Sequence, residues 1–264
     1  MPDILTRIFA RKAELRLQAE HSEPFELLHR RALERVAERR PFVGALRSQS
    51  HVGIIAEIKR ASPSAGLISR DFEPAHIARA YEDAGVDAIS VITEVDHFLG
   101  DLAFLDLARA ACTKPLLRKD FLASPYEIAQ AAAYGADAVL LIVAGLDDVA
   151  LSACREQART YRLDVLVEVH DERELERALR VDAEMIGVNN RDLRTFRTDL
   201  ATSEHLMPSI PRRVLAVAES GVRDADDALR LAQAGAQALL VGESLMRSED
   251  PAAMVAAIRV PLHP

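Results

Sequence analysis

Short apolar runs alternate with amphipathic segments from residue 52 onward. There are eight runs, at residues 52–58, 88–93, 115–119, 138–143, 164–169, 185–190, 214–220 and 238–242. The segments between them are rich in Ala, Leu, Arg and Glu at helical spacing. Strands that alternate with helices predict βα units and a parallel sheet, and nearly continuous apolar runs are typical of strands covered on both faces.

Three of these units share one plan, in which a helix ends in a small residue and a glycine before the next strand. They are YEDAGVDAISVIT, AAAYGADAVLLIV and LAQAGAQALLVG. Their glycines, Gly85, Gly135 and Gly235, suit the left-handed residue that ends a helix. Eight units predict a closed (β/α)8 TIM barrel of the α/β class. The alternatives are a solenoid and an open doubly wound sheet, although the GxGxxG turn typical of many such sheets is absent.

The first 48 residues differ from the rest of the chain. They are rich in charge, with apolar residues at helical spacing and a break at 22–24. This pattern predicts two amphipathic helices before the barrel. We therefore expect one domain over 1–264, of which 1–48 is an N-terminal helical extension.

Polar residues gather where the predicted strands end, which is where the active site of a parallel barrel forms. The residues in question are Glu57, Lys59, Lys119, Glu168, Asn189, Arg191, Glu219 and Ser220. Because side chains alternate along a strand, Glu57 and Lys59 share a face, and Lys119 and Glu168 point into the barrel mouth while Arg118 points away. One charged strand end is usually only a solvated terminus. Five ionisable groups of mixed sign predict instead an acid and a base with separated pKa values. These five are Glu57, Lys59, Lys119, Glu168 and Glu219.

Glycines follow the last two strands in a pattern typical of phosphate sites. Ser220 and Gly221 come before one helix and Gly242 directly before the next. In these barrels the last two loops and a nearby helix N-terminus commonly bind phosphate. Ser62, in the loop RASPSAG, could add a hydroxyl. The alternative is that these residues only form turns.

Composition excludes some classes of protein. The net charge is −8, from 33 Lys and Arg against 41 Asp and Glu, which argues against a nucleic-acid partner. Neither a secretory signal nor a membrane-spanning run is evident, so we expect a cytoplasmic protein. The cysteines Cys112 and Cys154 have no metal-like spacing, and no metal is required. His97 and His170 lie near strand ends and could shuttle protons, but we favour the interpretation that they are residues of the rim or of the shell behind the site.

Six motifs, in order over residues 52–247, resemble the indole-3-glycerol phosphate synthase family of tryptophan biosynthesis. They are IIAEIKRASPSAG, LLRKDF, VLVEVHD, IGVNNRDLRTF, AESGV and LLVGESLMR. The N-terminal extension is similar to that of the family. Ala65 departs from it, because many relatives have a lysine at that point of the loop. A fused phosphoribosylanthranilate isomerase half, seen in some relatives, is not expected.

The resemblance implies a carbon–carbon lyase, EC 4.1.1.48. It would convert 1-(2-carboxyphenylamino)-1-deoxy-D-ribulose 5-phosphate to indole-3-glycerol phosphate, CO2 and water. Lys119 would protonate the ribulose carbonyl, and Glu168 would transfer a proton during dehydration. Lys59 would either meet the anthranilate carboxylate or donate a proton in dehydration. No cofactor is implied, because the substrate supplies its own electron-rich ring.

The resemblance assigns the remaining site residues as well. Glu57 would oppose desolvation of Lys119, Glu219 would position hydroxyls or lysines, and Asn189 and Arg191 would orient the substrate. Phosphate would bind Ser220, Gly221, Gly242 and Ser62, and the aromatic ring would contact Phe98, Phe121 and Leu140. These last three are equally well explained as barrel packing.

We expect a monomer that acts on a small phosphorylated molecule, with no nucleic acid and no membrane as partner. Two rival functions remain. One is an aldolase on the same barrel that uses a strand-end lysine as a Schiff-base nucleophile. The other is a binding or scaffold protein that has lost catalysis.

Overall fold

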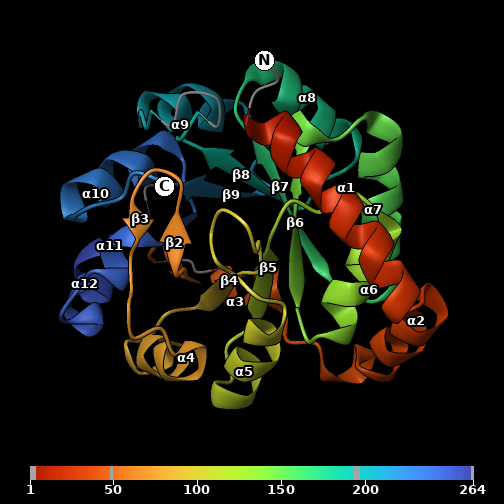
Figure 1. Cartoon of the computed structure of the whole chain (residues 1–264). Helices are drawn as coiled ribbons and strands as arrows, with labels where there is room; N and C mark the ends of the chain where they lie inside the picture. The colour runs from red at the N-terminus through yellow and green to blue at the C-terminus, as the bar shows by residue number, and fades with distance from the viewer. Residues whose placement is uncertain (1–3, 48–49, 193–196, 263–264) are drawn as a thin grey trace.

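The apolar runs form the strands of a barrel. The computed structural model describes residues 4–47, 50–192 and 197–262. The barrel strands are β1 (Gly53–Ile58), β4 (Ala88–Ile92), β5 (Leu116–Lys119), β6 (Ala138–Ile142), β7 (Asp164–Val169), β8 (Met185–Asn189), β9 (Leu215–Glu219) and β10 (Ala238–Val241). Within the described residues these eight strands close in the order β1-β10-β9-β8-β7-β6-β5-β4, and every pair is parallel (Figure 1). The predicted TIM barrel is confirmed, and the open-sheet and solenoid alternatives are wrong.

Helices surround the barrel on the outside (Figure 1). They are α4 (Pro74–Asp83), α5 (Ala103–Ala111), α6 (Pro125–Ala133), α7 (Asp148–Thr160), α8 (Glu172–Arg180), α9 (Ala201–Leu206), α10 (Ala225–Ala234), α11 (Glu243–Met246) and α12 (Pro251–Ile258). Several begin at an Asp or Ser whose side chain accepts a backbone hydrogen bond from the first turn, which is the usual N-cap. These caps are Ser124, Asp147, Asp171, Asp224 and Asp250.

Short elements complete the connections between strands and helices. An antiparallel hairpin of β2 (Ala61–Ser62) and β3 (Gly66–Leu67) forms the loop after β1. The 3-10 turns are η1 (Val36–Glu38), η2 (Val143–Gly145) and η3 (Met207–Ser209). The three glycines before strands have positive φ angles of 81°, 87° and 111° at Gly85, Gly135 and Gly235, as the repeat predicts.

The N-terminal extension contacts both ends of the barrel. It contains α1 (Ile4–Ser22), α2 (Phe25–Glu34) and a short α3 (Phe42–Leu46). The break between α1 and α2 falls where the sequence predicts it. The prediction of two helices is incomplete, because α3 follows η1 as a further helix. The backbone N–H of Val43 in α3 donates to Asp164 at the start of β7, so α3 lies at the N-terminal end of the barrel.

The first helix lies at the opposite end, beside the mouth. Lys12 of α1 donates to Asp120, just past the end of β5, over 2.8 Å. The Phe9 ring meets the Phe121 ring edge to face at 5.7 Å between centroids. α1 thus runs along the side of the barrel that carries α6 and α7 (Figure 1). The extension therefore forms part of the wall around the mouth.

Apolar side chains form two separate cores. One fills the space between strands and helices, and the other fills the barrel itself. Strand alternation separates them, so that Ile54 belongs to the outer core and Ile55 to the inner one. The inner core extends from Phe42 of α3 to Ile8 of α1 and Phe121 at the mouth. In the described part of the chain, no helix combines the length and the apolar character needed to cross a membrane.

Candidate active site

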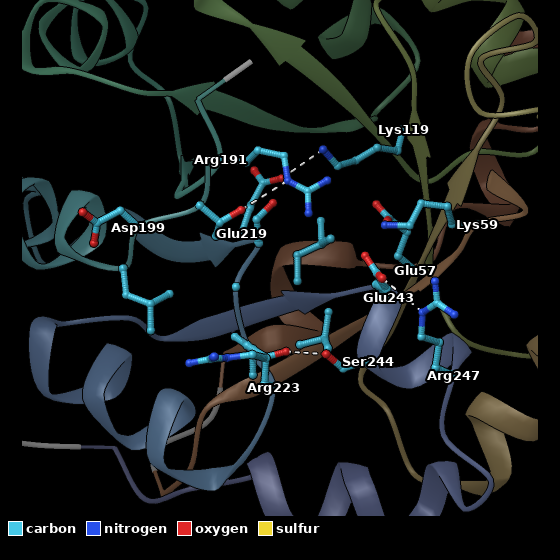
Figure 2. A pocket seen from close by; sticks show the side chains of 18 of the residues that line it. Glu57, Lys59, Lys119, Arg191, Asp199, Glu219, Arg223, Glu243, Ser244 and Arg247 are labelled. Atoms are coloured by element: carbon cyan, nitrogen blue, oxygen red, sulfur yellow. Dashed lines mark hydrogen bonds and ion pairs between the residues drawn. The ribbon is translucent and has the colours of Figure 1, made fainter. Parts of the chain in front are cut away.

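The polar strand-end residues meet at the carboxyl end of the barrel. Figure 2 shows Glu57, Lys59, Lys119 and Glu219 around one cavity, although they belong to strands far apart in the sequence. Their side chains are almost wholly buried, with 6% exposure for Glu57, 10% for Lys59 and 1% for Glu219. Inward-pointing positions at neighbouring strand ends force these groups together. The structure therefore brings together the charged residues that the sequence singles out.

Lys119 lies between two carboxylates. Its Nζ donates to Glu168 Oε2 over 3.1 Å and forms an ion pair with Glu219 Oε2 at 3.0 Å. Burial by itself lowers the pKa of Lys119, but the charges of Glu168, Glu219 and Glu57 raise it above its usual value. The lysine is therefore an ammonium ion at neutral pH, which is the form that a general acid needs.

The two carboxylates beside Lys119 have pKa values pushed apart. Burial raises the pKa of Glu219 to about 7, and although Lys119 opposes this, the nearby charge of Glu168 adds to it. For Glu168 burial also favours the neutral form, but Lys119 and His170 prevail and hold its pKa below the usual value. One carboxyl group thus stays ionised while the other takes up a proton near neutral pH. This separation is typical of acid–base sites.

Two carboxylate oxygens at the mouth lack a hydrogen bond from the protein. Among the described residues, Glu168 Oε1 and Glu219 Oε1 are buried and have no hydrogen-bond partner, whereas Glu219 Oε2 pairs with Lys119. Buried polar atoms in proteins are normally paired. Hydroxyl groups of a sugar substrate would supply the missing donors.

Two glycines leave room for the carboxylates. A Cβ atom at Gly187, in the middle of β8, would collide with Glu219 Oε1. A Cβ at Gly242 would collide with Glu57 Oε1 and would lie 2.8 Å from Lys59 Nζ. Gly242 thus has a steric role besides the turn that the sequence predicts, and the role of Gly187 is not predicted at all. The contacts arise only across the closed barrel.

Glu57 and Lys59 form a second pair at the mouth. Lys59 Nζ donates to Glu57 Oε1 over 2.6 Å. Burial favours neutral Glu57, but the charges of Lys59 and Lys119 lower its pKa below the usual value. Glu57 is thus a carboxylate near both lysines, and its role of opposing the desolvation of Lys119 stays a prediction.

The neighbours of Lys119 in LLRKDF point elsewhere. Arg118 donates to Thr93 over 3.0 Å and to Asp120 over 3.0 Å, on the helix side of β5. Burial opposes ionisation of Asp120, yet Lys12 and Arg118 lower its pKa to about 2. The three consecutive charges are thus divided between two environments, as strand alternation predicts.

An apolar wall adjoins the lysine pair. A cavity of about 90 Å³ is lined by Phe98, Phe121 and Leu140, together with Lys119 and Glu168. The Phe98 and Phe121 rings lie 6.3 Å apart between centroids, and their planes are tilted by 42°. The three predicted wall residues therefore lie together beside the acid–base groups.

The larger cavity, of about 570 Å³, reaches the loops after β9 and β10. Ser220, Gly221 and Gly242 line it, as expected of a phosphate site. Ser220 and Gly221 have positive φ angles of 67° and 94°, and such a conformation is uncommon for a serine. Sequence reasoning missed further polar residues of this lining, namely Arg223, Ser244 and Arg247. Their positions within five residues of a predicted phosphate glycine were the available signal.

Arg191 and Asn189 link the loop after β8 to the loop after β1. Arg191 lines both cavities, and its guanidinium donates to Ser64 Oγ over 2.9 Å. Its backbone N–H donates to Asn189 Oδ1 over 3.0 Å. Ser62 lines neither cavity. Its hydroxyl lies 3.4 Å from Ser64 Oγ and accepts from the N–H of Ala65, so its phosphate contact stays a prediction.

His97 and His170 each lie next to a buried glutamate near the mouth. The His97 N–H donates to Glu94, a buried carboxylate that also lines the smaller cavity and was not predicted. His170 lies beside Glu168. No cluster of three or more His, Cys, Asp or Glu suited to a metal occurs in the part of the chain that the structure describes. Residues 193–196 of the motif IGVNNRDLRTF lie outside the described residues.

Comparison with known proteins decides the family. The profile of indole-3-glycerol phosphate synthase matches residues 5–258. The chain is 46% identical to the indole-3-glycerol phosphate synthase of Laribacter hongkongensis over 260 residues, which cover 97% of this chain and 98% of that protein. The chain belongs to the indole-3-glycerol phosphate synthase family. Identity to the protein of that name from a Polaromonas species is 44% over 261 residues, covering 98% of each.

Solved structures with low sequence identity share the fold. The 3-hexulose-6-phosphate synthase of Salmonella typhimurium superposes with a TM-score of 0.64 at 15% identity, covering 78% of this chain and 96% of that one. Another 3-hexulose-6-phosphate synthase gives 0.59 at 20% identity and covers 79% and 98%. These likenesses concern the barrel alone.

Family membership establishes the activity. The chain is a carboxy-lyase of tryptophan biosynthesis, EC 4.1.1.48, that acts on a small phosphorylated substrate. It closes the indole ring of 1-(2-carboxyphenylamino)-1-deoxy-D-ribulose 5-phosphate and releases CO2 and water. The aldolase and the inactive scaffold are therefore the wrong alternatives.

Proposed function

We propose that Lys119 is the general acid for ring closure. The observation that carries this role is its position between Glu168 and Glu219, at 3.1 Å and 3.0 Å, with the apolar wall beside it. The anthranilate ring would pack against Phe98, Phe121 and Leu140, which places the ribulose carbonyl near the ammonium group. As the aromatic carbon attacks the carbonyl carbon, Lys119 would give its proton to the oxygen.

The carboxylates would act after CO2 has left. Glu168, ionised beside two cations, would accept a proton as the hydroxyl departs as water. Glu219 has a pKa of about 7 and an unpaired Oε1, so it would hold substrate hydroxyls with Oε1 and position Lys119 with Oε2. Glu57 would keep both lysines charged. Asn189, at the rim of the smaller cavity, would orient the substrate with Arg191.

Lys59 has two candidate roles, and mutation separates them. It would either bind the anthranilate carboxylate or protonate the departing hydroxyl. In a Lys59→Met variant, loss of carboxylate binding raises KM at constant kcat, whereas loss of a proton donor lowers kcat. Glu168→Gln supplies the comparison, because a residue that works only in dehydration should let the closed, decarboxylated intermediate accumulate in a single turnover.

The phosphate would bind in the larger cavity, at the loops after β9 and β10 and away from the apolar wall. Ser220, Gly221 and Gly242 would direct backbone N–H groups and a hydroxyl at it, with Ser62 from the loop after β1. Arg223 and Arg247 add positive charge to this lining. A complex with the product would test the orientation, and a phosphate bound beside Phe98 would contradict it.

The direct test of the acid–base roles uses the natural substrate. Indole product is fluorescent, so turnover is followed without coupling enzymes. Borohydride added during turnover should trap no substrate on Lys119 or Lys59, because neither acts as a nucleophile. A covalent adduct at either lysine would contradict the proposed chemistry.

We also propose that residues 1–264 act as one domain, with 1–48 as its extension, in a monomer in the cytoplasm. In support, the proposed acid, base and phosphate ligands all come from one barrel. Light scattering of the active enzyme would test whether it is a monomer, and fractionation of the source cells would test its location.

A further inference from the structure

His170 lies directly behind Glu168, at the turn from β7 into α8. Its Nε2 is 3.4 Å from Glu168 Oε1, and its Nδ1 is 3.0 Å from Glu174 Oε2. Nε2 and Oε1 are both buried, and neither has a hydrogen-bond partner among the described residues. The His170 N–H also donates to Glu174 Oε2 over 2.8 Å. One ring nitrogen is therefore held toward Glu168 and the other toward Glu174.

The His170 ring separates the acid–base site from another cavity. Beyond Glu168 lies Lys119, which donates to Glu168 over 3.1 Å. On the other side His170 and Glu174 line a third cavity, of about 750 Å³. The charges that act on His170 are those of Glu174, Glu168 and Glu219. The other charged residues that line the third cavity with His170 are Asp171, Asp192, Asp199, Arg173, Arg177 and Arg197.

The reaction consumes a proton that such a path could deliver. The aryl carboxylate of the substrate is ionised near neutral pH and leaves as CO2. Ring closure places a proton on the carbonyl oxygen, and loss of water requires another on the resulting hydroxyl. Formation of the indole ring returns only one of them. Every turnover therefore takes a proton from the solvent, and Lys119 has to regain its proton before the next turnover.

We propose that His170, with Glu174, relays this proton from the third cavity to Glu168 and so to Lys119. The Nε2–H bond of the imidazolium breaks as a bond forms between the proton and Glu168 Oε1. The carboxyl group of Glu168 then turns and protonates the Lys119 amine. Rotation of the ring brings its bare nitrogen to Glu174 and cavity water, where it regains a proton. Charge and atoms balance, and no electrons are transferred.

The charge state of the ring supports the relay. Burial lowers the pKa of His170, but Glu174 and Glu168 outweigh burial and raise it above the usual value. The protonated ring is thus favoured more strongly than in a free histidine. His170 acts through Glu168 and is a positioning residue rather than a catalytic one. The relay rests on the proposed roles of Glu168 and Lys119.

A purely structural role makes different predictions. The hydrogen bonds that Glu174 accepts from His170 also fasten the start of α8. In His170→Asn such bonds could remain, but the side chain could not carry a proton. The variants are His170→Ala, His170→Asn and, as a matched control, His205→Asn. His205 forms a similar pair, at 3.0 Å, with Glu172. Glu172 belongs to α8, as Glu174 does, but this pair lies on the exposed surface.

The measurement is kcat from indole fluorescence over about pH 6 to about pH 9, with and without imidazole. For wild type, kcat should fall as pH rises through the pKa of His170. In His170→Ala and His170→Asn, kcat should fall by about 10²-fold at unchanged KM, and this pH dependence should disappear. His170→Asn should also keep the wild-type thermal midpoint. Free imidazole should restore His170→Ala but not His170→Asn, in which the pocket is filled. The control should match wild type.

Wild-type kcat and pH dependence in folded His170→Asn would overturn the relay, and so would failure of imidazole to restore folded His170→Ala. If the alanine variant does not fold, the asparagine variant alone decides the question. Glu168→Gln distinguishes failure of the relay from failure of the proposed roles of Glu168 and Lys119. A wild-type rate in Glu168→Gln removes those roles and the relay with them. An impaired Glu168→Gln beside an unimpaired His170→Asn removes the relay alone.

Discussion

Replacing Glu219 by Gln should make stability less dependent on pH. The folded protein holds the proton of Glu219 more tightly than the unfolded chain does, because its pKa rises from 4.5 to about 7. A group of this kind stabilises the fold at low pH, and its contribution is lost as pH rises through the folded pKa. The total is about 3 kcal/mol, at about 1.4 kcal/mol for each tenfold change in proton affinity. Most of it falls between pH 5 and pH 8.

The assay is urea unfolding of wild type and Glu219→Gln at these two pH values. The difference in the free energy of unfolding should shift by roughly 2 to 3 kcal/mol in favour of the variant between the lower and the higher pH. Glu156→Gln is the control, because that side chain is 64% exposed and should produce no such shift. A constant difference at both pH values, or a shift in favour of wild type, would refute the claim that folding raises the pKa of Glu219.

Three further substitutions test other parts of the site. Gly242→Ala should lower kcat/KM by about 10²-fold with an unchanged fold, because its Cβ displaces Glu57; wild-type kinetics would contradict the close packing. Lys12→Met should lower the free energy of unfolding by about 3 kcal/mol at neutral pH by leaving buried Asp120 with one cation fewer, and this loss should shrink when Asp120→Asn is added. Ser220→Ala should raise KM about tenfold at constant kcat. A fall in kcat alone would place Ser220 at the reacting carbons.

The barrel and the lysine pair could be predicted because they depend on local pattern. Eight apolar runs and their glycine turns specify a parallel sheet, and alternation within a strand decides that Lys119 points inward while Arg118 does not. The end of a strand is a local feature, and the closure of the barrel then brings Lys119, Glu168 and Glu219 together.

Other features depend on contacts between distant segments. Gly187 is required because Glu219, on the adjacent strand, passes over it, and this follows from strand register. Likewise the position of α1 follows from Phe9 against Phe121 and from Lys12 with Asp120, residues 108 apart in sequence. Neither partner of such a pair carries a signal by itself. The short α3 was missed because five residues are too few to show a helical period.

The central claim is that Lys119 protonates the substrate carbonyl. Its most direct test is a single turnover of Lys119→Met, followed by indole fluorescence with enzyme in excess. The matched control is Lys114→Met, which changes a lysine before the opposite end of the same strand. The account predicts that Lys119→Met forms product at least about 10²-fold more slowly than wild type, while Lys114→Met keeps the wild-type rate. A rate near wild type in well-folded Lys119→Met would contradict it.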